Sequence, residues 1–227
     1  MNLFRQDDNK YGKSDYFDIQ FYYFKRRFGI DLFYQDYKGF YLKKDNSIYS
    51  DFKLKNIGMN AYFVFNYKQF SMPAAFKQSE KQINDAGSFL AFVSFVYQGL
   101  DTGKSLVPFG MQSSFPNDVN DLREGNFYTL SIGPGYAHTF LFTEDLTFTF
   151  LVHIGAGIQY QNYQTTTKDK TDFKLPLKGS IKLSLLYNIE HFFTGLNFHA
   201  DFNNVSFVET EFNIITIMIK FFAGLRF

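Results

Sequence analysis

Residues 146–161 read Leu-Thr-Phe-Thr-Phe-Leu-Val-His-Ile-Gly-Ala-Gly-Ile-Gln-Tyr-Gln, and the run alternates between two faces. One face is apolar from Leu146 to Tyr160, and the other carries threonine, histidine, glycine and glutamine. A period of two over this length predicts a β-strand with one apolar face. The run is much longer than the roughly 5–6 residues of an ordinary strand in a soluble protein.

The same alternation recurs in other segments, which gives nine expected strands in all. The other eight are residues 15–25, 28–42, 57–67, 87–99, 126–142, 175–188, 192–203 and 215–227. Tight turns are expected at residues 25–27, 143–145 and 189–191, and longer polar loops at 43–52, 100–125, 163–174 and 203–209. Short turns at one end and long loops at the other are typical of an outer-membrane β-barrel. We therefore predict an all-β, antiparallel transmembrane barrel.

Composition removes several other classes of protein. The chain has 23 Lys+Arg against 22 Asp+Glu, a net charge of +1, so no basic surface for nucleic acid is expected. Cysteine is absent, which excludes disulfides, thiolate zinc sites and cysteine nucleophiles. Aromatic residues make up 21%, yet the mean hydropathy is only −0.21. Apolar and polar residues must therefore be finely interleaved, as they are in strands.

A soluble, lipocalin-like ligand-binding barrel is the main alternative architecture. Such a barrel has eight strands, points its apolar faces inward and has a wet exterior. The apolar faces here are uniformly large and aromatic, and the strands are long, which favours the membrane barrel. Tyr67, Tyr97, Tyr160 and Tyr187 lie near strand ends, where they are expected to form interfacial girdles.

Nine strands are an odd number, whereas bacterial single-chain barrels usually have an even number with both termini in the periplasm. Residues 15–25 would then form an open sheet edge, which hydrocarbon does not tolerate. The first residues also lack the charged region and apolar core of a secretory leader. We expect residues 1–227 to be one barrel domain lacking an N-terminal part, with ten or twelve strands in the natural barrel.

The link between residues 68 and 86 contains Phe70-Ser71-Met72-Pro73-Ala74-Ala75-Phe76, Gln82 and Ala86-Gly87-Ser88-Phe89. The resemblance carried by these residues, and upstream by residues 28–34 and 37–41, is to an uncharacterised family found in Bacteroidota, domain of unknown function 4421. It implies an outer-membrane location and brings no known activity. The terminal Phe227 resembles the signal by which the barrel assembly machinery recognises its clients. That resemblance implies this machinery and outer-membrane lipid as partners.

The strand faces opposite the lipid gather charged side chains that are candidates for lining the lumen. They are Asp18, Asp31, His153, Lys178, Lys182, His199, Asp201, Lys220 and Arg226. Two interpretations remain open: a polar pore whose charges set its selectivity, or a filled interior whose ions and hydrogen bonds pair with one another. The expected role is non-enzymatic, either a barrel scaffold or a narrow, porin-like solute channel.

A membrane-embedded hydrolase is the alternative in which the same lumen does chemistry. His153 or His199 would act as base, Ser180 or Ser184 as nucleophile, and Asp201 would orient the base. No local nucleophile motif frames these serines. His199 and Asp201 lie on one strand face, but two ligands are too few for a metal site, so no metal or cofactor is expected.

The 68–86 link allows two interpretations of its own. It is either an ordered periplasmic lid or partner dock, or an amphipathic segment lying in the membrane interface. Loop 100–125 is the corresponding place for a surface partner.

Overall fold

The computed structural model describes residues 3–4, 15–42, 48–103, 107, 112–113, 120–165, 169–189, 191–207 and 210–225. Its single α-helix in these residues is α1 (Met72–Lys77). The strands are β1 (Leu3–Phe4), β2 (Asp15–Phe24), β3 (Phe28–Leu42), β4 (Ile48–Val64), β5 (Ala86–Asp101), β6 (Leu122–Leu141), β7 (Leu146–Thr165), β8 (Asp169–Lys174), β9 (Leu177–Asn188), β10 (Phe192–Phe207) and β11 (Thr210–Leu225).

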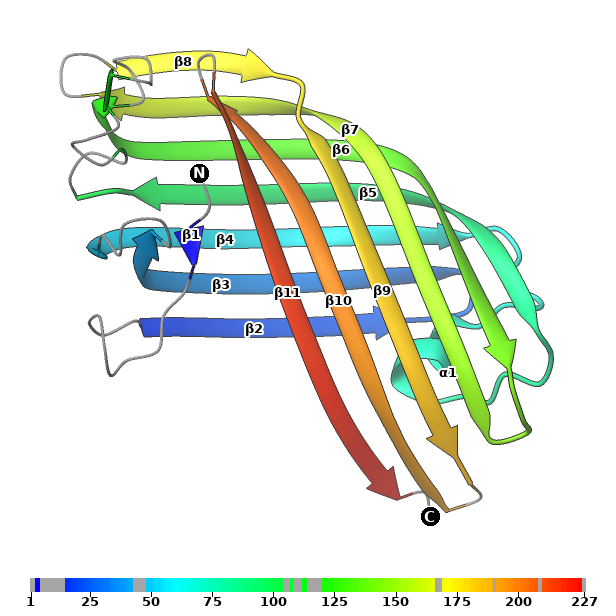
Figure 1. The fold of residues 1–227 in the computed structure, drawn as a ribbon. Coiled ribbons are helices and arrows are strands. Elements are labelled where there is room, and N and C mark those ends of the chain that lie inside the picture. Colours follow the sequence, from blue (N-terminus) through cyan, green and yellow to red (C-terminus); the bar gives the residue numbers. More distant parts are fainter. Residues whose placement is uncertain are drawn as a thin grey trace.

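All strands belong to one antiparallel sheet. The nine long strands follow the order β2-β3-β4-β5-β6-β7-β9-β10-β11, with β1 paired to the end of β3 and the short β8 to the end of β7. The sheet curls strongly. As a result β9, β10 and β11 cross over β2, β3 and β4 on the opposite wall of the interior, and they lie in front of them in Figure 1. The prediction of nine antiparallel strands is confirmed, and the sheet forms a half-barrel.

The tight turns are where the sequence predicted them. Lys25 N donates to Phe28 O at 2.8 Å, and Ile189 N to Phe192 O at 2.9 Å, each closing a hairpin. The loop boundaries were less accurate. The predicted loop 203–209 is wrong, because β10 continues to Phe207, which pairs with Thr210. Much of the predicted loop 163–174 is β8, which adds to the ladder of β7.

The apolar faces of the long strands point outward. Ile132 on β6 and Ile154 on β7 have exposed fractions of 65% and 63%, while the intervening positions of both strands are buried. Leu151, which shares the inward face with His153, is completely buried. The soluble-barrel alternative required the opposite arrangement, with apolar faces toward the interior.

The two outer long strands of the sheet are not paired with each other. Within the described residues β2 hydrogen-bonds only to β3, and β11 only to β10. The predicted open edge at residues 15–25 is therefore confirmed, and the described sheet is not closed into a full barrel. No helix in the described residues is long and apolar enough to cross a membrane.

Candidate functional site

The interior of the half-barrel is filled by side chains arranged in three layers. Strand β4 shows the order: Phe52 and Leu54 lie in an apolar cluster near the long loops, Asn56 and Asn60 in a polar layer, and Val64 in a second apolar cluster near the short turns. Strand β7 follows the same order: Tyr163 lies in the first apolar cluster, Gln159 in the polar layer and Leu151 in the second apolar cluster. The polar layer is the candidate functional site.

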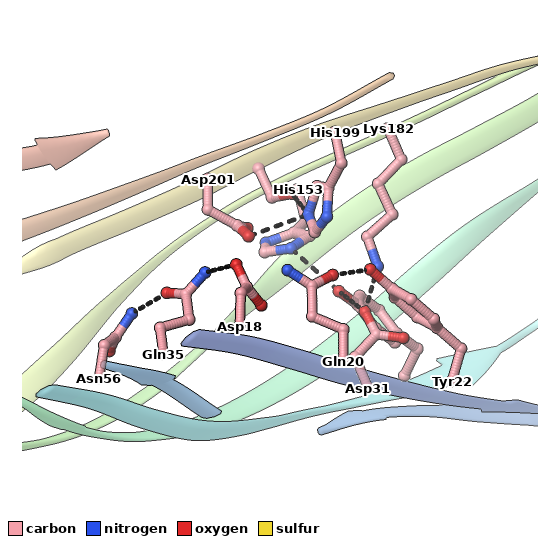
Figure 2. A network of polar contacts seen from close by, with 12 residues as sticks. Asp18, Gln20, Tyr22, Asp31, Gln35, Asn56, His153, Lys182, His199 and Asp201 are labelled. Carbon is pink, nitrogen blue, oxygen red and sulfur yellow. Dashed lines mark hydrogen bonds and ion pairs between the residues drawn. The ribbon is translucent and has the colours of Figure 1, made fainter. Parts of the chain in front are cut away.

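An ion pair spans the centre of the polar layer. Lys182 on β9 donates to Asp31 on β3, and both side chains are about 95% buried, with exposed fractions of 5% and 4%. The hydroxyl of Tyr62 donates to the same Asp31 oxygen at 3.2 Å and lies 3.4 Å from Nε2 of His153. The ring of His153 in turn packs on Phe92, with centroids 4.1 Å apart. Opposite walls of the curled sheet are thereby joined (Figure 2).

A second hydrogen-bonded group, with amides from β3 and β4, lines the same interior space as Asp31. Gln35 Nε2 donates to Asp18 Oδ2 at 2.9 Å, and Asn56 Nδ2 donates to Gln35 Oε1 at 2.7 Å. The hydroxyl of Tyr37 also donates to Asp18, at 2.8 Å. Because a carboxylate only accepts hydrogen bonds, Asp18 fixes which way round both amides sit. Asp18 therefore closes one end of the network, as Figure 2 shows.

Ser180, His199 and Asp201 lie together, but not as a catalytic triad. Ser180 Oγ is 3.1 Å from His199 Nε2, and Asp201 Oδ2 is 3.0 Å from the same nitrogen. A Ser-His-Asp triad needs the serine on one ring nitrogen and the carboxylate on the other. Ser184, the other nucleophile considered, instead donates to the carbonyl of Ala75 at 2.8 Å. In this geometry Ser180 and Asp201 approach the same nitrogen of His199, so the three residues do not form a triad.

The other residues that the sequence predicted to line the lumen lie elsewhere in the fold or outside the described residues. Lys178 is buried beside the ring of Phe33, at 5.9 Å from its centroid. Lys220 on β11 lies 4.7 Å from the ring centroid of Tyr22 on β2. Arg226 and Phe227 lie outside the described residues. No group of three or more His, Cys, Asp or Glu side chains in the described part of the chain could hold a metal ion.

The 68–86 link folds into an ordered plug at the short-turn end. Ser71 caps α1, since its Oγ accepts from Ala74 N at 3.1 Å, and it also donates to Glu80 at 2.8 Å. Gln82 holds both ends of the link: its Oε1 accepts from Ser71 N at 3.0 Å, and its Nε2 donates to the carbonyls of Gln69 and Asn84. The family-like residues of the link thus have structural roles.

Apolar contacts seat this plug inside the sheet. Phe70, Met72, Ala74 and Ala75 are buried, and Phe76 packs on Phe24 of β2 at 5.9 Å between ring centroids. The helix lies inside the curl between β2 and β9 (Figure 1). The apolar side chains of α1 are therefore packed against the sheet inside the protein.

Gly87 and Ser88 of the family-like motif also have local roles. Ser88 Oγ accepts from Asn66 N at 2.9 Å. A Cβ at Gly87 would lie 2.3 Å from the hydroxyl of Tyr136, so glycine allows this close approach.

Two rows of aromatic side chains run along the outer surface. At the long-loop end, Tyr97, Tyr128, Tyr160 and Phe173 pair across β5 to β8, with ring centroids 5.1, 6.1 and 5.4 Å apart. The row at the short-turn end contains Phe89, Tyr136, His138, Phe140, Phe148 and Phe150. Between the rows on these strands most outward positions are aliphatic, as Leu130 and Ile132 on β6 illustrate, and Phe95 on β5 is an aromatic exception.

Several residues of the polar layer were not singled out from the sequence. Tyr62, Asn56 and Gln35 are buried and central to the network, and Tyr22 donates to Gln20 beside it. The signal was present, because Asn60 and Tyr62 share the polar face of an alternating strand. The sequence alone does not show which strands face each other across the interior, so these contacts needed the fold.

The fold and its interior define a class: a strongly curled antiparallel β half-barrel with an apolar outside and a filled polar centre. The family comparison agrees with the resemblance of the link. A family model described as a domain of unknown function, DUF4421, matches residues 2–227, so the chain belongs to that family. No curated protein and no solved structure matches the chain.

Proposed function

We propose that the protein is an outer-membrane β-barrel protein with a non-enzymatic, scaffold role. The observation that carries the proposal is the outer surface: an aliphatic band bounded by two aromatic rows. Tyr128 and Tyr136 on β6 are separated by eight residues (136 − 128), and Tyr160 and Phe150 on β7 by ten (160 − 150). At about 3.3 Å per residue these spans are about 26 and 33 Å along the strands.

Strand tilt reduces these lengths to the thickness of a membrane. With a tilt of roughly 35–45°, the two spans cover about 19–27 Å across the bilayer, a range that includes the apolar band of about 25 Å in outer-membrane barrels. Aromatic girdles at both interfaces are also a feature of that class. The thickness of the band and its bounding rows thus support the proposal together.

The filled interior favours a scaffold over an open channel. An ion pair and its hydrogen bonds occupy the polar layer, and α1 lies beneath it at the short-turn end. A water-filled pore would need these side chains and the plug to move apart. In a planar bilayer we expect the folded protein to show no steady conductance, and a constant open pore would contradict the scaffold role.

Lipid is the first expected partner, and single tryptophans can test it because the chain has none. Ile132→Trp places the reporter in the middle of the band, and Ile83→Trp places it on the link, where the isoleucine is 80% exposed. Phe92→Trp supplies a buried control. In vesicles we expect acyl-brominated lipid to quench the fluorescence of Ile132→Trp, aqueous iodide to quench that of Ile83→Trp, and neither to quench that of Phe92→Trp.

The opposite pattern at position 132 would refute the membrane proposal. Iodide quenching of Ile132→Trp in a protein that is monodisperse without detergent would identify a water-facing surface. The barrel assembly machinery is the second proposed partner. Deleting Phe227 should slow insertion by the purified machinery, and unchanged insertion would argue against this recognition.

A further inference from the structure

The polar layer contains a small internal cavity. It is lined by side chains from β2, β3 and β4 on one wall of the half-barrel and from β10 and β11 on the other. Its volume is about 10 Å³, which is space for about one water molecule or one bare ion. The described residues that line it include two carboxylates, Asp31 and Asp201, and no lysine or arginine.

Four buried oxygen atoms of the cavity lining have no hydrogen-bond partner within the described residues. They are the Oδ1 atoms of Asp31, Asn56, Asn60 and Asp201. Asn60 is only 1% exposed, so water outside the protein does not reach its side chain. Buried polar atoms in folded proteins are nearly always paired. Four unpaired acceptors around one cavity therefore indicate that the cavity binds a ligand.

Each carboxylate is held by one oxygen and presents the other to the cavity. Asp31 accepts from Lys182 and from the hydroxyl of Tyr62 with its Oδ2 atom, which leaves Oδ1 unpaired. Asp201 lies 3.0 Å from Nε2 of His199 with its Oδ2 atom, and again Oδ1 is unpaired. The two carboxylates are thus fixed in place by contacts on one side only.

The amides are oriented so that an oxygen is the free end. Asp18 accepts from Nε2 of Gln35, and Oε1 of Gln35 accepts from Nδ2 of Asn56. Oδ1 of Asn56 is therefore the end left for the cavity. Asn60 is the direct neighbour of Asp31 on the adjacent strand. Figure 2 shows Asp31 and Asn56 extending from one wall toward the interior and Asp201 from the other.

A lining with unpaired acceptors and no unpaired buried donor favours a cation over water. A water molecule donates two hydrogen bonds, so one water would pair with only two of the four oxygens. A cation attracts all of them. Carboxylate and amide oxygens are ligands that suit Ca²⁺ and Mg²⁺. Mg²⁺ usually keeps several of its own waters, for which this cavity is too small, so its size favours Ca²⁺.

We propose that the cavity binds one Ca²⁺ ion, coordinated by the four unpaired oxygens. Ca²⁺ takes about six to eight oxygen ligands, and the side chains of Asn203 and Thr216, which also line the cavity, can supply further ones. The ion joins β3 and β4 on one wall to β10 on the other. It adds a cross-lumen link next to the pair of Lys182 with Asp31.

The nearby lysines set the sign of an electrostatic test. Lys182 is paired with Asp31, and Nζ of Lys178 lies 5.9 Å from the ring centroid of Phe33, which lines the cavity. Neither lysine lines the cavity itself, but both bring positive charge near it. Because like charges repel, removing the charge of Lys178 should strengthen the binding of a cation.

Terbium luminescence can report the ion directly. Tb³⁺ occupies Ca²⁺ sites and is excited by energy transfer from nearby tyrosines, of which Tyr22 lines the cavity, and the chain has no tryptophan to compete. The protein is refolded in detergent with a chelator, which is then removed. We expect saturable Tb³⁺ luminescence that Ca²⁺ displaces at a concentration at least tenfold lower than Mg²⁺ or Na⁺ does.

Three variants tie the signal to the cavity. Asn60→Leu should weaken Ca²⁺ binding at least tenfold, yet it should not lower the urea midpoint of the ion-free protein, because it removes a buried unpaired oxygen. Asp201→Asn keeps the shape of the side chain and should also weaken binding at least tenfold. Lys178→Met should strengthen binding several-fold. The matched control is Gln161→Met: Gln161 is a buried amide with unpaired atoms outside this cavity, and its replacement should leave Ca²⁺ affinity unchanged.

Several results would overturn the proposal. One is the lack of any luminescence that Ca²⁺ displaces, and another is displacement by Na⁺ at the same concentration. Wild-type affinity in both Asn60→Leu and Asp201→Asn would place the ion on surface carboxylates and leave water in the cavity. Weaker binding in Lys178→Met would also contradict the site. The measurement is made in detergent and does not depend on lipid contact, so its failure can be told from that of the proposed function.

Discussion

Removing one partner of the central ion pair is the sharpest test of how the interior holds the curl. Lys182 and Asp31 come from β9 and β3, on opposite walls of the half-barrel, and are separated by 151 residues in the chain. Lys182→Met keeps the length of the side chain and removes its charge. Asp31 is then left as a buried carboxylate with Tyr62 as its remaining donor.

The expected loss follows from the burial of the pair. Breaking a buried ion pair from one side costs about 3–5 kcal/mol, because the remaining charge is uncompensated. The bond from Tyr62 places the expected loss near the lower end, at about 3 kcal/mol. The double variant Lys182→Met/Asp31→Leu removes both charges and should recover most of this loss, since apolar replacement of buried pairs is often close to neutral.

Urea unfolding in detergent, followed by circular dichroism, measures these differences. The single variant should unfold at a urea concentration about 1–2 M lower. The control is Lys53→Met: its Nζ also pairs with a carboxylate, that of Asp101 at 3.1 Å, but the two side chains are 53% and 40% exposed. The Lys53→Met substitution should lower the free energy of unfolding by at most about 1 kcal/mol. Equal effects at both lysines, or a double variant no more stable than the single one, would refute the reasoning.

Three further predictions concern the strands, the plug and the polar layer. Gly133→Ala should lower the free energy of unfolding by about 1–3 kcal/mol through overpacking, because its Cβ would lie 2.2 Å from a backbone oxygen of β7. Gly179→Ala is the control: its Cβ would lie 3.5 Å from the nearest backbone oxygen, so the unfolding midpoint should change little. Equal midpoints for the two glycine variants would contradict this close approach of β6 and β7. Gln82→Leu should loosen the plug, since three hydrogen bonds are lost, and limited proteolysis should cut the link faster than in wild type; an unchanged cutting rate would argue against its role. A fluorophosphonate probe should leave Ser180 unlabelled, because the serine and Asp201 share one histidine nitrogen; stoichiometric labelling seen by mass spectrometry would restore the hydrolase interpretation.

The strands could be predicted from the sequence because their signal is local. Alternation over residues 146–161 sets which side chains of β7 point outward, and the fold places Ile154 and Ile158 there as expected. The strand ends were harder to predict. Residues 203–207 contain Asn203, Asn204 and Ser206 and look like a loop. Pairing with β11 nevertheless extends β10 through them, because a long ladder satisfies their backbone groups.

The plug and the cross-lumen contacts could not be predicted in the same way. Helix α1 has six residues, too few for a helical period to be read. Its position depends on Gln82, shortly after the helix, and on Ser184, which is 109 residues from its partner Ala75. The pairing of Asp31 with Lys182 depends on the curl of the whole sheet. The sequence placed both on the polar face, and only the fold made them partners.

The layered interior also explains how a half-barrel with two open edges keeps a defined shape. Strand pairing sets the twist of a sheet. It leaves the curl of the whole sheet adjustable, because the angle between neighbouring strands can vary. The contacts that set the curl are those that cross the interior: Lys182 to Asp31 in the polar layer and Ser184 to the plug below it. Lys220 on β11 lies 4.7 Å from the ring centroid of Tyr22 on β2, although the backbones of these two strands form no ladder in the described residues. Contacts between side chains across the interior therefore join the two walls where strand pairing does not.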